Sequence, residues 1–160
     1  MNKPRVLKIG SSMDEMFRVE RFVEEISDEH MLYGNYFGNI LMAVTEAVQN
    51  AITHGNRMNA MKRVTITGEA SKEGLWIIVS DEGNGFAYTQ YANTAEAEQG
   101  LISGKKGLFL IHRLADEVSF KNGGKTIEML FRINGIDESI FERRVAFMQE
   151  FFKVYSRLNT

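Results

Sequence analysis

The sequence predicts an α+β protein in which helices cover one face of an antiparallel or mixed sheet. Strand-like alternation occurs in five short runs, and four of them form two pairs separated by turn residues, as in hairpins. Helical spacing of apolar residues occurs in four further segments. With 160 residues, no internal repeat and no low-complexity linker, the chain suits one domain with a sizeable core.

The first third of the chain predicts one strand followed by two helices. The run "RVLKI", from Arg5 to Ile9, alternates as a short strand does. Ser12 and Glu15 have the spacing of a capping box, which predicts a helix from about Ser12 to Ser27. A second helix is expected from Tyr36 to His54, with Gly55 as its C-cap.

The remainder predicts two hairpins, a long loop and two helices. In order, the expected elements are strands at 63–70 and 75–81, a loop at 87–103, a helix at 107–116, strands at 117–122 and 125–133, and a helix at 137–158. Loops of this length are uncommon in compact domains unless they are functional or disordered.

Composition excludes several classes of function. The formal net charge of −2 gives no global electrostatic case for nucleic acid or a membrane surface. The chain has no cysteine, and its three histidines lie far apart, so a zinc site is not expected. The N-terminus lacks the apolar run of a signal peptide, and the longest uncharged run is broken by glycine and asparagine. A cytoplasmic protein is the default expectation.

The second helix carries very little charge. Glu46 is the only charged residue between Tyr36 and His54. One stripe of the helix is apolar and predicts the core-facing side: Leu41, Val44, Val48 and Ile52. Glu46, Asn50 and His54 follow at intervals of four on the opposite side, beside small alanines, so this face is expected to be covered too, at least in part.

A covered carboxylate needs a partner, because burying an unpaired charge is costly. A metal-bound anion would satisfy Glu46 and Asn50 together, since hard cations take carboxylate, amide and phosphate oxygens. The alternative is an ordinary helix with one surface glutamate, and the spacing alone leaves both interpretations open.

Two glycine-rich turns follow. In "VSDEGNGF", Asp81 ends an apolar strand and precedes Gly83 and Gly85, which permit a ligand to approach the backbone; a plain turn is the alternative. An aspartate at such a position can accept a hydrogen bond from an exocyclic amine such as that of adenine. In "GKKGLFLI", lysines precede a helix N-terminus, where phosphate binds well, although an ordinary loop-to-helix junction has the same appearance.

In order and spacing, these three segments resemble the GHKL ATPase superfamily. "EAVQNAITHG" is similar to its N-box, "DEGNGF" to its first glycine box and "GKKGLFLIHRLADEV" to its second. The likeness covers roughly Arg5 to Ile133 and is greatest to the bacterial anti-sigma-factor serine/threonine kinases. The resemblance implies a two-layer α/β sandwich with a mixed, mostly antiparallel sheet covered by helices on one face.

The resemblance also implies roles for individual residues. Asn50 would hold Mg²⁺ against the phosphates of ATP, and Glu46 would act as the general base. Asp81 would read the adenine amine, with Gly83 and Gly85 shaping the pocket and Thr126 assisting the aspartate. The loop from Ala87 to Lys106 would form a lid over ATP. The second glycine box would contribute further nucleotide contacts through Gly104, Lys105, Lys106, Gly107 and Leu108.

The second glycine box departs from the family pattern G-x-G-L, because Lys105 occupies the position of the first glycine. A side chain there could crowd the phosphates, or its ammonium could bind them. This departure motivates a second hypothesis, a non-catalytic regulator that binds a partner in a nucleotide-dependent manner.

Partners follow from the resemblance alone. The family phosphorylates a serine or threonine of a STAS-type anti-sigma-factor antagonist and also binds a sigma factor. We expect a kinase domain at residues 1–134 and an added amphipathic helix at 135–160. That helix has an apolar four-three alternation that fits either packing on its own domain or an interface such as a homodimer: Phe141, Val145, Met148, Phe152 and Tyr155.

Overall fold

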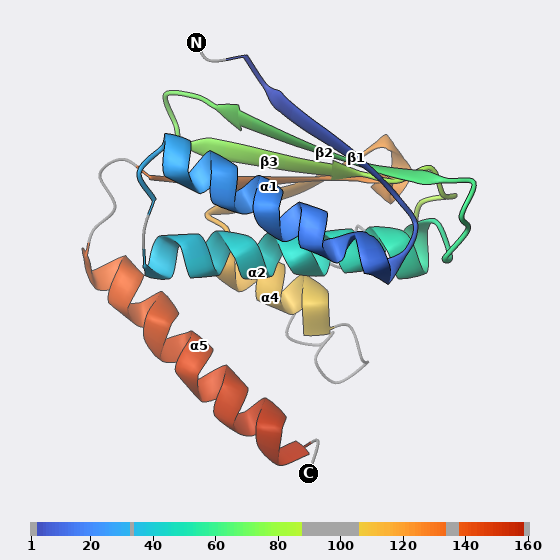
Figure 1. The fold of residues 1–160 in the computed structure, drawn as a ribbon. Helices are drawn as coiled ribbons and strands as arrows, with labels where there is room; N and C mark the ends of the chain where they lie inside the picture. The colour runs from blue at the N-terminus through green and yellow to red at the C-terminus, as the bar shows by residue number, and fades with distance from the viewer. Residues whose placement is uncertain (1–2, 33, 88–105, 134–137, 159–160) are drawn as a thin grey trace.

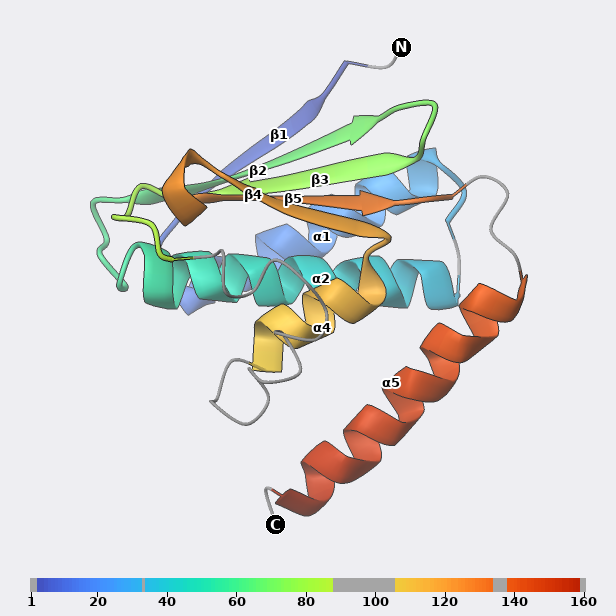
Figure 2. The same ribbon diagram turned by 180° about the vertical axis from the view of Figure 1, so that it is seen from behind.

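The computed structural model describes residues 3–32, 34–87, 106–133 and 138–158. A sheet forms one layer, and the helices α1, α2 and α4 lie together against one of its faces (Figures 1 and 2). The N-terminus lies beside the sheet, whereas the C-terminus lies at the far end of the last helix, away from both layers (Figure 1). The expected two-layer α+β architecture is confirmed.

The sheet has five strands in the order β1-β2-β3-β5-β4. Their bounds are β1 Arg5–Gly10, β2 Arg63–Ala70, β3 Leu75–Ser80, β4 Glu117–Lys121 and β5 Thr126–Phe131. All four pairings among these strands are antiparallel. Both predicted hairpins are present, and β5 inserts between β3 and β4, with Ser80 opposite Thr126. The end of β3 therefore lies beside the start of β5.

The predicted helices form with small changes at their ends. Their bounds are α1 Met16–Glu29, α2 Asn35–Asn50, α4 Lys106–Leu114 and α5 Glu138–Leu158. Three short turns accompany them, namely η1 Met13–Glu15, the π turn η2 Ala51–Gly55 and η4 Asn122–Gly124. The segment from Tyr36 to His54 is therefore not uniformly α-helical, because it widens into a π turn after Asn50.

The capping box predicted at Ser12 and Glu15 does not form as expected. The Ser12 hydroxyl accepts a hydrogen bond from the Asp14 N–H at 3.3 Å and so caps η1. The Glu15 carboxylate pairs instead with Arg18 at 2.6 Å, one turn further along. A 3₁₀ turn therefore precedes α1, and the regular α-helix begins at Met16.

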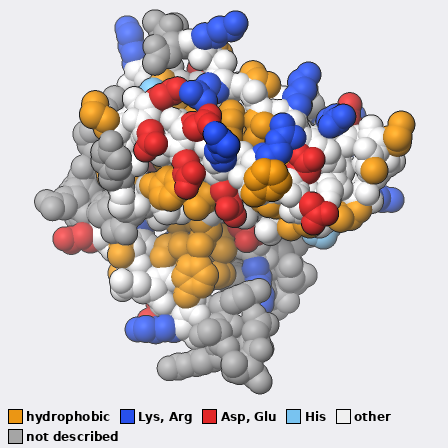
Figure 3. Space-filling model, viewed as in Figure 1, with side chains coloured by type: hydrophobic (Ala, Val, Ile, Leu, Met, Phe, Trp, Pro, Cys, Tyr) orange, Lys and Arg blue, Asp and Glu red, His pale blue; other side chains and the backbone are white. Residues whose placement is uncertain are grey.

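The core lies between the sheet and the first two helices. Burial of this apolar surface is the main source of stability for the fold. Among its fully buried members are Ile9, Val19, Val44, Val48, Ile52, Val64, Ile66 and Ile77. The predicted apolar stripe of α2 thus faces the core, although Leu41 is only partly buried. The outer face of α1, which points away from the core, is covered by charged side chains of both signs (Figure 3). Hydrophobic side chains gather below them in this view, toward α5.

The last helix, α5, extends away from the two layers (Figures 1 and 2). Its first half is attached to α4 and to the turn after it: the rings of Phe147 and Phe109 of α4 lie 5.7 Å apart, and Arg144 pairs with Asp116 of the turn at 2.6 Å. Phe152 is 45% exposed.

The contact face of α5 agrees with the predicted stripe only in part. Met148 of that stripe packs against the core, as predicted, but Phe147 and Phe151 accompany it in place of the exposed Phe152, because the helix docks through the side chains that meet α4. The side chains of Phe141 and Tyr155 lie outside the described residues. Among the described helices, none is both long enough and apolar enough to cross a bilayer.

Candidate active site

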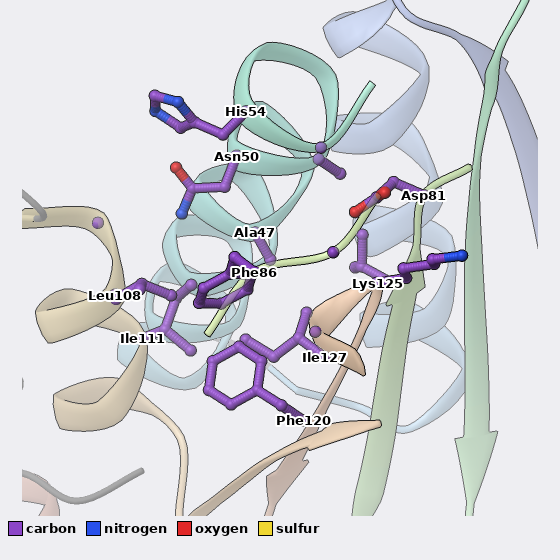
Figure 4. A pocket seen from close by; sticks show the side chains of 16 residues that line it. Ala47, Asn50, His54, Asp81, Phe86, Leu108, Ile111, Phe120, Lys125 and Ile127 are labelled. Carbon is purple, nitrogen blue, oxygen red and sulfur yellow. The ribbon is translucent and has the colours of Figure 1, made fainter. Parts of the chain in front are cut away.

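The charge-poor helix ends in a π turn that places its polar residues at a cavity. The Asn56 N–H closes the turn on the Ala51 carbonyl at 2.7 Å, a spacing of five residues. Such turns occur mostly as local insertions in α-helices and are frequent at functional sites. Asn50 directly precedes the turn and His54 lies within it, and both line the cavity (Figure 4).

The cavity has a volume of about 390 Å³ and lies between the end of α2, the start of α4 and the edge of the sheet where β3 ends. Its polar members come from separate elements: Asn50, His54, Asp81 and Lys125. Its apolar part is formed by Phe86, Leu108, Ile111, Phe120 and Ile127 (Figure 4). Phe86 and Phe120 meet edge to face, with ring centroids 5.4 Å apart. An apolar cavity with a few convergent polar groups is typical of a small-molecule site.

Asp81 is held at the end of β3 with its carboxylate directed toward the cavity (Figure 4). Its N–H donates to the Lys125 carbonyl at 2.9 Å, and its Oδ1 accepts from the Gly83 N–H at 2.8 Å. Burial raises the pKa of the Asp81 carboxyl, while the Gly83 N–H and the charges of Lys125 and Lys62 oppose this increase. The carboxylate can therefore accept a hydrogen bond from a ligand in the cavity.

Glycines bring the N-box and the first glycine box into direct contact. A Cβ atom on Gly83 would lie 2.0 Å from the Gly55 carbonyl oxygen, and one on Gly55 would lie 2.4 Å from the Asp81 carboxylate. Either atom would require the two segments to separate. The prediction of Gly55 as the helix C-cap is therefore wrong: Gly55 is the last residue of the π turn, Asn56 is the C-cap, and Gly55 serves instead to admit Gly83 and Asp81 at close range.

The second glycine box meets the N-box on the other side of the cavity. A Cβ atom on Gly107 would lie 2.6 Å from Glu46 Oε2 and 3.3 Å from Asn50 Nδ2. Gly107 stands in the first turn of α4, so Glu46 and Asn50 lie beside the N-terminal end of that helix. Glu46 is half-buried, and this burial raises the pKa of its carboxyl.

The structure brings most of the predicted site residues together. Asn50, Asp81, Gly85, Gly107 and Leu108 line the cavity. Glu46 lies beside Gly107, and the buried Gly83 lies against Gly55. Lys106 begins α4. Gly104, Lys105 and the greater part of the predicted lid lie outside the described residues.

Thr126 is the predicted site residue that the structure does not bring to the cavity. Its hydroxyl bonds to the Ser80 hydroxyl at 2.9 Å and accepts from the Asn122 amide at 3.1 Å. Alternation along β5 places Ile127, rather than Thr126, on the side that faces the helices. The role of Thr126 beside Asp81 stays a prediction.

Several lining residues were not assigned a role from the sequence. Phe86, Ile111, Phe120, Lys125 and Ile127 complete the cavity, although none stands in a recognisable chemical pattern. The signal that could have found Phe120 and Ile127 is their pairing in the predicted second hairpin, which places them opposite each other. Lys125 follows Gly124 in the turn that precedes β5.

The donors in the site suit a cation shared with a ligand. Within the described residues, no group of three or more histidine, aspartate or glutamate side chains could by itself hold a metal ion. Asn50 and Glu46 offer an amide and a carboxylate one helical turn apart, beside Gly107. Mg²⁺ commonly takes only one or two protein oxygens together with phosphate oxygens, and these residues fit that pattern.

Comparisons with known proteins identify relatives of this chain. The curated relatives include the serine-protein kinase RsbW of Staphylococcus epidermidis, 35% identical over 97 residues that make up 56% of this chain and 61% of that protein. RsbW of Bacillus subtilis is 32% identical over 105 residues, 61% of this chain and 65% of that protein. The aligned part of the chain thus spans less than two thirds of the length of these relatives.

A model of the histidine kinase-like ATPase domain family matches residues 11–131. The matched segment runs from the end of β1 to the end of β5 and contains every residue that lines the cavity. The resemblance to GHKL ATPases is therefore confirmed, and the chain belongs to the family of histidine kinase-like ATPase domains.

Proposed function

We propose that this protein is an ATP-dependent serine/threonine kinase that acts on another protein. One observation carries the proposal: Glu46 and Asn50 lie beside Gly107 at the start of α4, across the cavity from Asp81. An amide that suits a magnesium ion and an acceptor for a nucleobase amine thus line one cavity, and a base lies against Gly107 of its lining. The relatives are serine-protein kinases, and this likeness gives further support.

In this proposal the adenine lies in the inner part of the cavity. Asp81 accepts a hydrogen bond from the exocyclic amine, and the apolar side chains pack against the ring. The volume of about 390 Å³ falls within the usual range for ligand cavities. The half-buried carboxylate makes a stronger hydrogen bond than an exposed one, because the surrounding dielectric is lower.

The phosphates extend toward Asn50 and the start of α4. Free N–H groups at a helix N-terminus and the charge of Lys106 favour phosphate there. The absence of a side chain at Gly107 leaves the backbone open to close approach. The side-chain amide oxygen of Asn50 would bind Mg²⁺, and the ion would neutralise charge on the phosphates.

Glu46 would take the proton from the incoming hydroxyl. A bond forms between that oxygen and the γ-phosphorus as the bond from the γ-phosphorus to the ADP oxygen breaks, and the proton passes to the Glu46 carboxylate. Because burial raises the pKa of Glu46, its carboxylate is a better base than an exposed glutamate.

The protein substrate is proposed from the likeness to anti-sigma-factor kinases. We expect a serine or threonine on a STAS-type anti-sigma-factor antagonist, with a sigma factor as the second partner. Action in the cytoplasm, where ATP is abundant, is part of the same proposal.

Phosphotransfer from labelled ATP and Mg²⁺ to a STAS-domain protein of the same organism tests the proposal. We expect a phosphoprotein with the wild-type chain and at least a hundredfold lower rate with Glu46→Ala or Asn50→Ala, roughly the loss typical of a general base. Full transfer by both variants would overturn the site assignment. Binding of ATP and capture of the partner without any phosphoprotein would instead identify the non-catalytic nucleotide-dependent regulator.

A further inference from the structure

Asn56, the residue that follows the π turn, is a buried amide with a full set of hydrogen bonds. Its residue exposure is 1%. Its Nδ2 donates to the Ser11 hydroxyl at 2.8 Å and to the Arg63 carbonyl at 2.9 Å, and its Oδ1 accepts from the Glu82 N–H at 2.8 Å. A buried side-chain amide that is satisfied in this way holds its partners in one geometry.

The partner that matters for the site is the Glu82 N–H. Three consecutive N–H groups set the shape of the turn that carries the Asp81 carboxylate. The Asp81 N–H donates to the Lys125 carbonyl, the Glu82 N–H to Asn56 Oδ1 and the Gly83 N–H to Asp81 Oδ1. Asn56 provides the only side-chain acceptor among these bonds other than Asp81 itself.

Asn56 also joins this turn to the N-box. Its own N–H closes the π turn on Ala51, so one residue bonds to the π turn through its backbone and to the Asp81 turn through its side chain. The adjoining residue, Gly55, is in direct contact with Gly83. Movement of the Asp81 turn relative to Asn50 is therefore restricted by both a hydrogen bond and a steric contact.

We propose that Asn56 is a positioning residue that affects which nucleobase binds. It does so by accepting a hydrogen bond from the Glu82 N–H and thereby holding the turn that carries Asp81. The inference rests on the proposed function, in which Asp81 accepts a hydrogen bond from the adenine amine. Such a bond weakens steeply with misalignment, so the preference for an amine at this position depends on how firmly the turn is held.

Three variants separate positioning from general stability. Asn56→Ala removes the bond to the Glu82 N–H, whereas Asn56→Asp keeps an oxygen for that N–H and loses the amide donors. Ser11→Ala removes one of the bonds on the other side of the amide, away from the Asp81 turn. All three weaken the same buried network, and only Asn56→Ala releases the turn.

The measurement is calorimetric affinity for ATP and for ITP, whose base has a carbonyl in place of the amine, at a temperature where each variant is folded. We expect the wild type to prefer ATP at least about tenfold, the value of one hydrogen bond to a charged group. In Asn56→Ala the affinity for ATP divided by the affinity for ITP (the ATP-to-ITP ratio) should fall to about one. Asn56→Asp and Ser11→Ala should keep the wild-type ratio, although their melting temperatures should be lower.

A wild-type ratio in folded Asn56→Ala would overturn the inference, as would an equal loss of preference in Ser11→Ala or Asn56→Asp. If Asn56→Ala does not fold, a loss of the preference for ATP in folded Ser11→Ala or Asn56→Asp would still overturn the inference. A wild type that binds neither nucleotide would remove the proposed function, and the inference with it. A wild type that prefers ATP, combined with an unchanged Asn56→Ala, would remove the inference alone.

Discussion

The two sides of the cavity are built by different kinds of interaction. The hydrogen-bonded wall, formed by η2, Asn56 and the turn at 81–83, is held by hydrogen bonds from backbone N–H groups, two of them to the side chains of Asn56 and Asp81, and by glycines with no space for a Cβ atom. The packed wall, formed by α4 with α5 behind it, is held by contacts between side chains. Backbone contacts cannot adjust to a change by rotating a side chain, whereas packed side chains can.

The packed wall has two faces with separate contacts. Leu108 and Ile111 of α4 line the cavity, whereas Phe109 and Arg113 meet α5. The Arg113 guanidinium lies 5.3 Å from the ring centroids of both Phe109 and Phe147. α5 thus supports α4 from the side opposite the proposed nucleotide. The wall that carries Asp81 is thus fixed by hydrogen bonds to backbone groups and by close glycine contacts, whereas the wall formed by α4 is secured by side-chain packing from outside.

The largest effect is expected from Gly83→Ala in the hydrogen-bonded wall. Its Cβ would meet the Gly55 carbonyl at 2.0 Å, and neither backbone can yield without breaking the wall. We expect a loss of roughly 3 kcal/mol in the free energy of unfolding, together with loss of ATP binding. Urea denaturation and calorimetry measure the two effects.

The matched control is Gly38→Ala in α2, where a Cβ would meet nothing within 4 Å. Because alanine is the better helix former, the control should be more stable by about 0.5–1 kcal/mol. Equal behaviour of the two variants would show that the contact between Gly55 and Gly83 is not rigid.

The next effect concerns the support of the packed wall. Arg144→Met removes the ion pair with Asp116, whose two side chains are only 17% and 11% exposed. The Asp116 carboxylate keeps its bond from the Arg132 N–H but loses its charged partner, so unfolding should become easier by about 2 kcal/mol. Thermal and urea denaturation measure the loss.

Arg21→Met is the control, since the pair of Arg21 with Glu25 is exposed and screened by solvent and should contribute little to the free energy of unfolding. The ATP-to-ITP ratio should not change in Arg144→Met, because base reading belongs to the other wall. A changed ratio would mean that the two walls are not independent.

A smaller effect on stability is expected where the walls meet, at Gly107. In Gly107→Ala the new Cβ conflicts with Glu46 Oε2, the far end of a flexible side chain, which can move away. We expect a change below about 1 kcal/mol in stability and a fall of roughly a hundredfold in phosphotransfer, because the base is displaced. If activity persisted at the wild-type rate, Glu46 would not be the base.

The smallest effect on stability, and one of opposite sign, is expected from Glu46→Gln. Glutamine relieves the cost of burying a charge and should stabilise the fold by roughly 0.5 kcal/mol near neutral pH while abolishing transfer. The pKa of Glu46 is raised by burial above its ordinary value of 4.5, so the folded protein retains a proton that the unfolded chain has already lost.

The contribution of Glu46 to the free energy of unfolding of the wild type therefore falls as the pH rises from about 4.5 through the raised pKa. It is highest below that range. The advantage of Glu46→Gln over the wild type should accordingly grow with pH across this window and level off above it. An advantage that shrinks with rising pH would contradict the burial of an uncompensated carboxylate. Urea denaturation at several pH values supplies the comparison.

Local patterns in the sequence predicted the helices, the strands and several residues of the cavity. Apolar periodicity located each helix and strand of the described residues. The half-buried state of Glu46 and Asn50 followed from the missing charges of α2, but His54, which was expected on the same covered face, is exposed. Asp81 could be placed at a strand end because the preceding run is apolar. These features depend on residues close together in the chain, where spacing alone determines geometry.

Features that depend on contacts between distant segments could not be predicted in this way. Asn56 has the appearance of a turn residue, and its bonds to Ser11 and Glu82 exist only after β1 and β3 lie on either side of β2. The place of Thr126 depended on which face of β5 meets the helices, and a shift of one residue reverses that face. The contact face of α5 depended likewise on the surface of α4.

The central claim is that Asn50 and Asp81 border one magnesium-dependent ATP site. Calorimetric titration of the purified protein with ATP, with and without Mg²⁺, beside Asn50→Ala, tests it most directly. We predict binding that is strengthened by Mg²⁺ in the wild type and insensitive to Mg²⁺ in the variant. A folded wild type that binds no ATP, or an Asn50→Ala protein that keeps the full magnesium dependence, would contradict it.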